Sequence, residues 1–296
     1  MPTIKSILYA LKAWLLPPTH TPRKAPRQNS GNPPTRHFRT TTRPHSSTST
    51  QETPPMNKIV MVTNFSGNVG KTTITKNLLG PNLFDVKLFA VEDINAGYNQ
   101  GEAVQLSADE TRKILESVIE ASFEQDVIVD IGASNVSNFF THLKTFDDFQ
   151  SFVTAVIIPT EPSEKVQVDT VSTMKYLLND LAFPPEKLKV IINKAPVRDT
   201  ETRSLETFKT VYDCAFELGI SIAGIIPEND TFQLAAQRKL TIPELAAQNP
   251  KDLLSSIKAA GGDAKEASKL VLAITSAKKL QLRLSDIFQK LDLDNL

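Results

Sequence analysis

From residue 57 onward the chain alternates between continuous apolar runs and longer amphipathic segments. The apolar runs are rich in β-branched residues and predict strands. They lie at residues 57–64, 87–92, 126–131, 153–158, 188–193 and 220–226. Apolar residues at helical spacing predict helices at 71–79, 109–123, 135–149, 164–182 and 200–218. Apolar strands separated by helices are typical of a parallel sheet buried on both faces, so we expect a three-layer, doubly wound, mostly parallel α/β fold.

A further amphipathic pattern lies near the C-terminus. An apolar stripe at helical spacing runs through Leu270, Ile274, Ala277, Leu280, Leu284, Ile287 and Leu291. Residues 251–290 also carry eight Lys and Arg against four Asp and Glu. We expect 248–296 to be a helical segment packed on the domain. Four alternatives are open for its basic face. It would be only solvated, or it would contact DNA phosphates without sequence preference, dock on a membrane surface, or bind a partner protein.

Residues 1–55 have a different character from the rest of the chain. Eight Lys and Arg face a single acidic residue, Glu52, and Pro, Ser and Thr replace aliphatic residues after position 17. Such a segment buries too little apolar surface to offset its chain entropy, so we expect a disordered extension. It would be a transit peptide, a membrane-surface anchor or, the interpretation we favour, translated upstream sequence with Met56 as the working start. The expected folded domain then spans 56–247.

The most informative segment joins the first expected strand to the first helix. A small-residue loop after the strand closes on Lys71, and a helix-prone run follows. This layout predicts a phosphate-binding loop, in which backbone N–H groups converge on an anion at a helix N-terminus. A glycine-rich turn without a ligand is the alternative. The expected nucleotide-binding residues are Gly67, Asn68, Val69, Gly70, Lys71, Thr72 and Thr73, and Lys71 would also be catalytic as a cation on the β- and γ-phosphates.

Further polar residues follow later strands, where ligands bind in such folds. We expect Asp130 to be catalytic and to hold Mg²⁺ together with Thr72, although a strand-end Asp can also cap the next helix. Glu92 would be catalytic by orienting the attacking water or a metal ligand, or it would be a solvated loop carboxylate. Asn193 and Pro227 follow the last two strands, and we expect both to contact the adenine base of ATP.

Two neighbouring positions refine this prediction. The bare N–H of Gly132, after Asp130, could approach a γ-phosphate. Pro196 stands where a GTPase motif Asn-Lys-x-Asp has its Asp, so guanine selectivity is unsupported. ATP with Mg²⁺ is therefore the expected ligand.

Composition excludes some classes of protein. Cys214 is the only cysteine, which rules out an intramolecular disulfide and an iron–sulfur reductase with two cluster cysteines per chain. No run of 18 apolar residues exists, so we expect no transmembrane segment.

With these motifs in order, the chain resembles the ParA/MinD group of deviant P-loop ATPases over roughly residues 56–247. The strings NFSGNVGKTT, VEDINA and VDIGASNV resemble most closely the StbB plasmid-stability proteins of conjugative plasmids, and IIPENDTFQLAAQ resembles MinD-type proteins. The resemblance implies a nucleotide switch in plasmid partition or conjugation and an ATP-dependent homodimer. It also implies a DNA-binding partner from the same operon and a cytoplasmic, nucleoid- or plasmid-associated location in bacteria.

The chain departs from the family pattern in ways that affect chemistry. Phe65 replaces the first motif glycine, Asn68 replaces another, and Ser66 stands where the family has a lysine that reaches the partner's site. Ile94 replaces one carboxylate of the family's Asp-x-Asp. Serine cannot supply positive charge to the phosphoryl transition state, so we expect slow hydrolysis or ATP binding without turnover.

A small-molecule kinase or ligase of the dethiobiotin-synthetase kind is the alternative function. It would need an acceptor pocket with convergent Arg or Lys side chains, and the sequence places no such cluster near the strand ends.

Overall fold

The structure is a computed structural model that describes residues 57–91, 98, 102–107, 110–197, 201–259, 261 and 263–296. All of these residues belong to one compact unit. The expected extension 1–55, Met56 and Glu92 lie outside the described residues.

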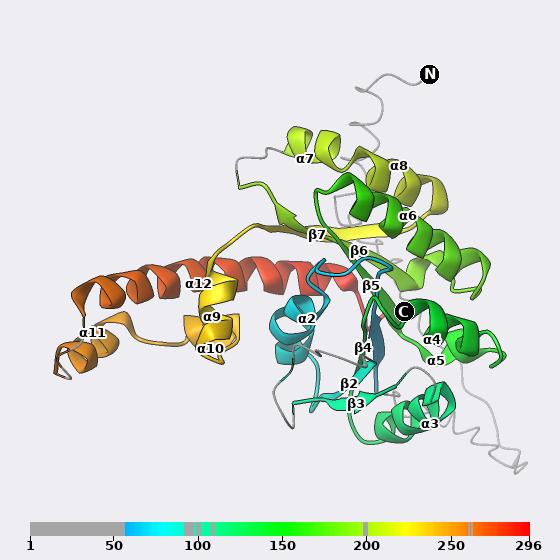
Figure 1. Cartoon of the computed structure of the whole chain (residues 1–296), viewed down its shortest axis with the longest axis horizontal. Helices are drawn as coiled ribbons and strands as arrows, with labels where there is room; N and C mark the ends of the chain where they lie inside the picture. The colour runs from blue at the N-terminus through cyan, green and yellow to red at the C-terminus, as the bar shows by residue number, and fades with distance from the viewer. Residues whose placement is uncertain are drawn as a thin grey trace, which may run out of the picture. The chain divides into compact units, whose positions relative to one another are not determined.

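A seven-stranded sheet forms the centre of this unit (Figure 1). Its strands are β1 (Ile59–Val62), β2 (Lys87–Val91), β3 (Val104–Leu106), β4 (Val127–Ile131), β5 (Ala155–Thr160), β6 (Leu188–Ala195) and β7 (Ser221–Pro227). Their order is β3-β2-β4-β1-β5-β6-β7, and every neighbouring pair is parallel. The three-layer, doubly wound fold is confirmed, and all six expected strands are present. The pattern missed β3, a three-residue edge strand with two exposed residues and too little apolar sequence to stand out.

Helices cover both faces of the sheet. One apolar cluster joins it to α3 (Thr111–Ser122), α4 (Val136–Leu143), α6 (Glu164–Asn179) and α8 (Lys209–Leu218). The other joins it to α2 (Lys71–Ile74), the π-helical turn η1 (Thr75–Leu79), α10 (Ile242–Ala246) and α12 (Ala264–Leu291). Successive β1 residues alternate between the two clusters, as the pleat of a strand requires. The short 3-10 turns η2 (Gly80–Asn82) and η4 (Pro185–Lys187) link elements.

Three expected helices are not continuous. The helix expected at 135–149 ends at Leu143, and α5 (Phe149–Phe152) begins after Asp148, whose left-handed backbone (φ 60°) interrupts the helix. The one expected at 200–218 splits into α7 (Glu201–Thr207) and α8 around Phe208, which is fully buried. The one expected at 71–79 changes from α to π geometry after Ile74.

The C-terminal region contains more helices than the pattern predicted. The additional ones are α9 (Thr231–Gln237) and α10, whereas α11 (Pro250–Ala259) and α12 lie within the expected helical segment 248–296. All seven residues of the α12 stripe are buried, and α12 contacts α10, β7 and η1. Among the described residues, no helix combines the length and apolar character that a membrane crossing needs.

The strand order determines where a ligand can enter. β1 lies between β4 and β5, so the chain leaves this central strand in both directions along the sheet. At such a switch point, the loops beyond the carboxyl ends of the strands diverge and leave a crevice. The loop after β1 and the N-terminus of α2 lie there.

Candidate functional site

Two residues of the loop after β1 have left-handed backbone conformations. Asn68 has φ 57° and Gly70 has φ 92°. A Cβ on Gly70 would also overlap Nδ2 of Asn193, so both the dihedral angle and the close approach require glycine. Gly67 is different, because its nearest neighbour to an added Cβ is Ala133 at an ordinary 3.9 Å.

Three side chains bind the carbonyl groups of the loop. Nζ of Lys71 donates to Ser66 O at 2.9 Å, and Nδ2 of Asn193 donates to Val69 O at 2.9 Å. Nζ of Lys194 donates to Asn68 O at 2.6 Å and also pairs with Glu161 at 2.8 Å. A second cation, Lys194 of β6, therefore lies at the loop beside Lys71.

The N–H groups of the loop remain available. Among the described residues, no acceptor is bound to the N–H groups from Gly67 to Gly70. With the carbonyls held on other side chains, these donors and the start of α2 form a cradle for an anion. The geometry fits a phosphate chain.

Phe65 stands at the position of the missing glycine, and its ring is packed against neighbouring aromatic rings. Its ring packs edge-on against Phe140 and Tyr176, with centroid distances of 6.1 and 5.9 Å. Just before it, the Asn64 side chain is buried and donates to Pro159 O and to Thr170 Oγ1, both at 2.8 Å. The entrance of the loop is thus anchored by packing and hydrogen bonds to α6 and β5.

Ser66, which stands at the lysine position of the family, has a partner within its own chain. Its hydroxyl donates to Oδ2 of Asp169 on α6 at 2.5 Å. A carboxylate therefore lies beside the loop where the family pattern has a cation. This arrangement adds no positive charge to a bound phosphate chain.

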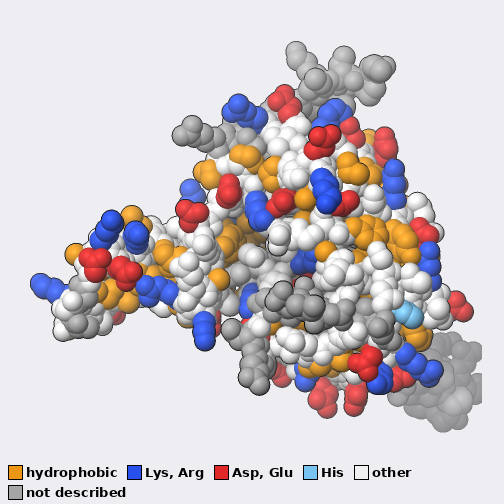
Figure 2. All heavy atoms as spheres, in the orientation of Figure 1, with side chains coloured by type: hydrophobic (Ala, Val, Ile, Leu, Met, Phe, Trp, Pro, Cys, Tyr) orange, Lys and Arg blue, Asp and Glu red, His pale blue; other side chains and the backbone are white. Residues whose placement is uncertain are grey.

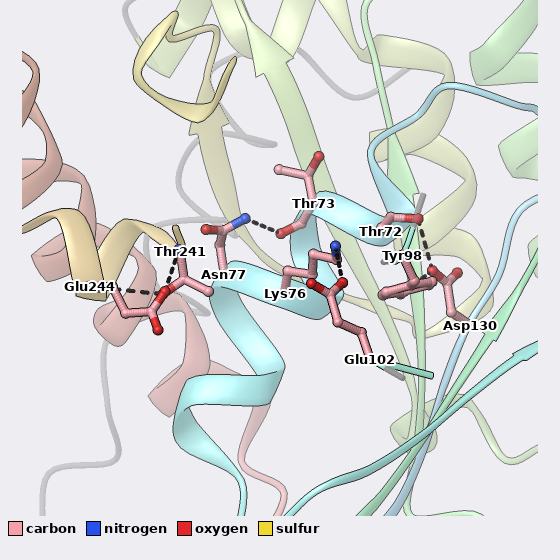
Figure 3. A network of polar contacts seen from close by, with 9 residues as sticks. All are labelled: Thr72, Thr73, Lys76, Asn77, Tyr98, Glu102, Asp130, Thr241 and Glu244. Carbon is pink, nitrogen blue, oxygen red and sulfur yellow. Dashed lines mark hydrogen bonds and ion pairs between the residues drawn. The ribbon is translucent and has the colours of Figure 1, made fainter. Parts of the chain in front are cut away.

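Thr72 and Asp130 face each other across the crevice (Figure 3). The Thr72 hydroxyl donates to Asp130 Oδ2 at 3.0 Å, and the phenol of Tyr98 donates to the same oxygen at 2.6 Å. Hydroxyl and carboxylate oxygens are ligands that Mg²⁺ accepts, so this pair would hold a magnesium ion. Such an ion would offset negative charge on bound phosphates.

Burial shifts the pKa values of Asp130 and Tyr98. It raises the pKa of Asp130 above its ordinary value, against the opposing effects of the Tyr98 and Thr72 hydrogen bonds and the Lys71 charge. Burial and the neighbouring Asp130 also raise the pKa of Tyr98, which keeps its phenol a hydrogen-bond donor. Next to them, Lys76 pairs with Glu102 at 2.6 Å, and its Nζ lies 4.8 Å from the centre of the Tyr98 ring (Figure 3).

The remaining expected residues are Gly132, Pro227 and Glu92. Gly132 donates its N–H to Val91 O at 3.0 Å, so this donor is already used and the expectation that it reaches a γ-phosphate is wrong for this conformation. Pro227 ends β7, where it pairs in register with Ala195 of β6. Glu92 lies outside the described residues.

A scan against protein-family profiles and a search of curated proteins found no match. Among solved structures, a McdA variant from Cyanothece in complex with ATP is similar, with 13% identity, coverage of 76% of this chain and 97% of that one, and a TM-score of 0.44. The cell division ATPase MinD of Pyrococcus furiosus is 16% identical over 76% of this chain and all of its own (100%), with a TM-score of 0.43. A ParA family ATPase from Chlorobium tepidum is 14% identical over 66% of this chain and 93% of its own, with a TM-score of 0.44. Because these identities and TM-scores are low, the fold assignment rests on the strand order and the loop geometry of the chain itself.

The sequence missed three residues of the site. Lys194 follows Asn193 directly, and only its left-handed backbone (φ 51°) turns it toward the loop. Asp169 lies on α6, 103 positions from Ser66, and Tyr98 lies 32 positions from Asp130. No local pattern marks a contact of this kind, whereas the loop itself was marked by its glycines and its position between strand and helix.

Proposed function

We propose that the chain is an ATP-binding, Mg²⁺-dependent nucleotide switch with slow hydrolysis. The observation that carries the proposal is the loop after β1. Its carbonyls at Ser66, Asn68 and Val69 are each bound by a side chain, which leaves the N–H groups from Gly67 to Gly70 for phosphates.

Each residue of the site has a separate role in this proposal. The loop N–H groups and Lys71 bind the phosphate chain, with Thr73 in the first turn of α2. Thr72 and Asp130 hold Mg²⁺, and Asn193 lies on the base side of the loop. Glu92 and Pro227 are proposed only from their places in the sequence, after β2 and at the end of β7.

Slow turnover follows from the charge at the start of the loop. Hydrolysis develops negative charge on the transferred phosphoryl group, and a cation there stabilises it. In this chain Ser66 is bound to the carboxylate of Asp169 instead. The same observation supports a second candidate, a module that binds ATP without turnover.

The biological role is a finer proposal. The NFSGNVGKTT, VEDINA and VDIGASNV strings support an StbB-like protein in plasmid stability, partition or conjugation. It would act as an ATP-dependent homodimer with a DNA-binding partner of the same operon, in the bacterial cytoplasm on the nucleoid or plasmid. Within the chain, we propose 56–247 as the ATPase domain and 248–296 as a helical segment packed on it.

Substitution of Lys71 tests ATP binding. Lys71→Ala removes a buried cation that also holds the Ser66 carbonyl, so affinity for a fluorescent ATP analogue with Mg²⁺ should fall by at least about 100-fold. Lys113→Ala is the matched control, because Lys113 is exposed on α3 and, among the described residues, pairs only with Glu110. It should bind as the wild type does. Unchanged affinity in Lys71→Ala would reject the proposal.

A further inference from the structure

The two oxygens of the Asp130 carboxylate have different surroundings. Asp130 lies on β4, next to β1, and only 5% of its surface is exposed. Its Oδ2 accepts hydrogen bonds from Thr72 at 3.0 Å and from Tyr98 at 2.6 Å (Figure 3). No described residue is hydrogen-bonded to the other oxygen, Oδ1. One oxygen is therefore held by the protein on two sides, and the other is left for a ligand.

The two hydroxyl donors come from different parts of the chain. Thr72 lies on α2 beside the phosphate-binding loop, and its own oxygen is a proposed metal ligand. Tyr98 comes from the connection between β2 and β3, away from that loop in the sequence. A protonated phenol has one proton to donate, and Asp130 accepts it. Tyr98 therefore holds the carboxylate without taking a place at the metal.

A second contact fixes the ring of Tyr98. The residue is buried, and Nζ of Lys76 lies 4.8 Å from the centre of its ring (Figure 3). The same Nζ pairs with Glu102 at 2.6 Å, just before β3. Lys76 follows Thr72 by four residues in the helical run that begins at Lys71. This run therefore carries one donor to Asp130 and also holds the ring of the other.

Fixing one oxygen of a carboxylate fixes the direction of the other. With two hydrogen bonds on Oδ2, rotation of the carboxylate about its Cβ–Cγ bond would break both of them. Magnesium demands nearly ideal octahedral geometry, so it is sensitive to the direction of an oxygen that faces it or its bound water. Groups that orient metal ligands from outside typically change metal affinity by about 10- to 100-fold.

We propose that Tyr98 is the positioning residue of the magnesium site, which holds Oδ2 of Asp130 so that Oδ1 is presented to the ion or its water shell. The inference rests on the nucleotide and Mg²⁺ binding proposed above. It deepens that function by making the magnesium-dependent part of nucleotide affinity depend on the connection between β2 and β3. Affinity that needs no metal would not depend on Tyr98.

The test titrates a fluorescent ATP analogue with excess Mg²⁺ and again with EDTA. Tyr98→Phe keeps the ring and removes only the hydroxyl group. Its affinity in EDTA should change by less than about twofold, whereas the gain in affinity from Mg²⁺ should fall about tenfold or more. The control is Tyr212→Phe, which removes the same group from a half-buried tyrosine on α8. It should leave both values unchanged.

A double variant shows whether Tyr98 acts through the metal site. Thr72→Ala removes a proposed ligand and should by itself abolish most of the gain from Mg²⁺. If Tyr98 acts by orienting Asp130 for the same ion, Tyr98→Phe should cause little further loss in the Thr72→Ala background. Fully additive losses would show that the two hydroxyl groups act independently, and would overturn the inference.

The remaining contrary results are also distinct. Equal losses with Mg²⁺ and with EDTA in Tyr98→Phe would show that the phenol only supports local packing. A larger gain from Mg²⁺ would show that the phenol competes with the ion for Asp130. Either result overturns the inference while wild-type binding still supports the proposed function. If the wild type binds the analogue without any gain from Mg²⁺, or does not bind it, the proposed function itself fails and the inference fails with it.

Discussion

Individual residues of the loop are constrained to different degrees. Gly70 has both a left-handed backbone and a neighbour, Asn193, in the space that a side chain would need. Gly67, the other glycine of the loop, has neither constraint. Two glycines that look equivalent in the sequence therefore differ in what substitution should cost.

Alanine substitutions at Gly70 and Gly67 should show this difference in constraint. Gly70→Ala forces a strained dihedral and displaces Asn193, so we expect the free energy of unfolding to fall by about 2 kcal/mol or more. Gly67→Ala should change it by less than about 0.5 kcal/mol. Urea unfolding followed by circular dichroism measures both. Equal losses in the two variants would contradict the geometry described for Gly70.

Cys214 offers a probe of the folded state. It is buried, and burial raises the pKa of its thiol, so less of the reactive thiolate forms at a given pH. Alkylation by iodoacetamide at pH 8 should therefore be at least about tenfold slower than for a free cysteine, whose pKa is about 8.5. The labelling rate should increase only at a pH above the usual pKa of a thiol. It should become fast when the protein unfolds. Rapid labelling of the native protein at pH 8 would show that the thiol is accessible.

At this scale the sequence marked the residues that a local motif requires. Lys71, Thr72 and the glycines were evident from the loop, and Asp130 from its place at the end of an apolar strand. Asp169 and Tyr98 were not, because their contacts with Ser66 and Asp130 join parts of the chain that only the sheet brings together.

Among the elements, α12 depends on close packing against β7. Its position follows from the missing side chain at Gly224, which lets Ile287 approach the strand. The sequence predicted this helix from its apolar stripe but did not indicate which strand it covers. That choice depends on the fit between two surfaces, which periodicity does not encode.

Substitution of Gly224 tests this packing. Gly224→Ala should lower the free energy of unfolding by about 1–3 kcal/mol, because the added methyl group overlaps a fully packed side chain. In Ile287→Ala the same Gly224→Ala change should cost less, since the clash is removed. A double-mutant cycle in urea measures this coupling. Additive effects of the two changes would indicate that α12 does not depend on this contact.

The breaks in two expected helices show what the apolar periodicity of a segment does not predict. Segments 135–149 and 200–218 have continuous helical periodicity, yet each is interrupted where a residue has another role. Asp148 adopts a left-handed conformation before α5, and Phe208 is inserted into a small apolar cluster with Ile192 and Ala195. Periodicity records which face is apolar and not where the backbone turns.

For the whole molecule, the uneven charge along the chain bears on DNA binding. The 251–290 region is basic, but Lys279 and Arg283 line a hollow at the end of β7, and Lys278 does not. Figure 2 shows Lys and Arg side chains interspersed with acidic and apolar ones over the part formed by α11 and the start of α12, without a continuous basic surface. The face shown there therefore offers no broad basic surface for DNA phosphates.

The role of residues 1–55 can be tested on the whole chain. A chain that begins at Met56 should melt within about 5 °C of the full chain, because the composition of the removed segment supports little packing. It should also bind the ATP analogue with the same affinity. Differential scanning calorimetry and the binding titration measure these quantities. A much lower melting temperature would mean that the extension packs on the domain.

The hydrogen bond between Asn193 and Val69 also has a consequence for synthesis of the chain. It joins residues 124 positions apart. Without this bond and the one from Lys194, two of the three loop carbonyls have no side-chain partner. At ribosomal rates of roughly 5–20 residues per second, Asn193 is made about 6 to 25 seconds after Val69. Throughout that interval β1 and α2 are already synthesised, but the phosphate cradle is incomplete. In the proposed function, nucleotide would therefore not guide the early folding of the sheet, and its binding would report that the sheet has been assembled at least as far as β6.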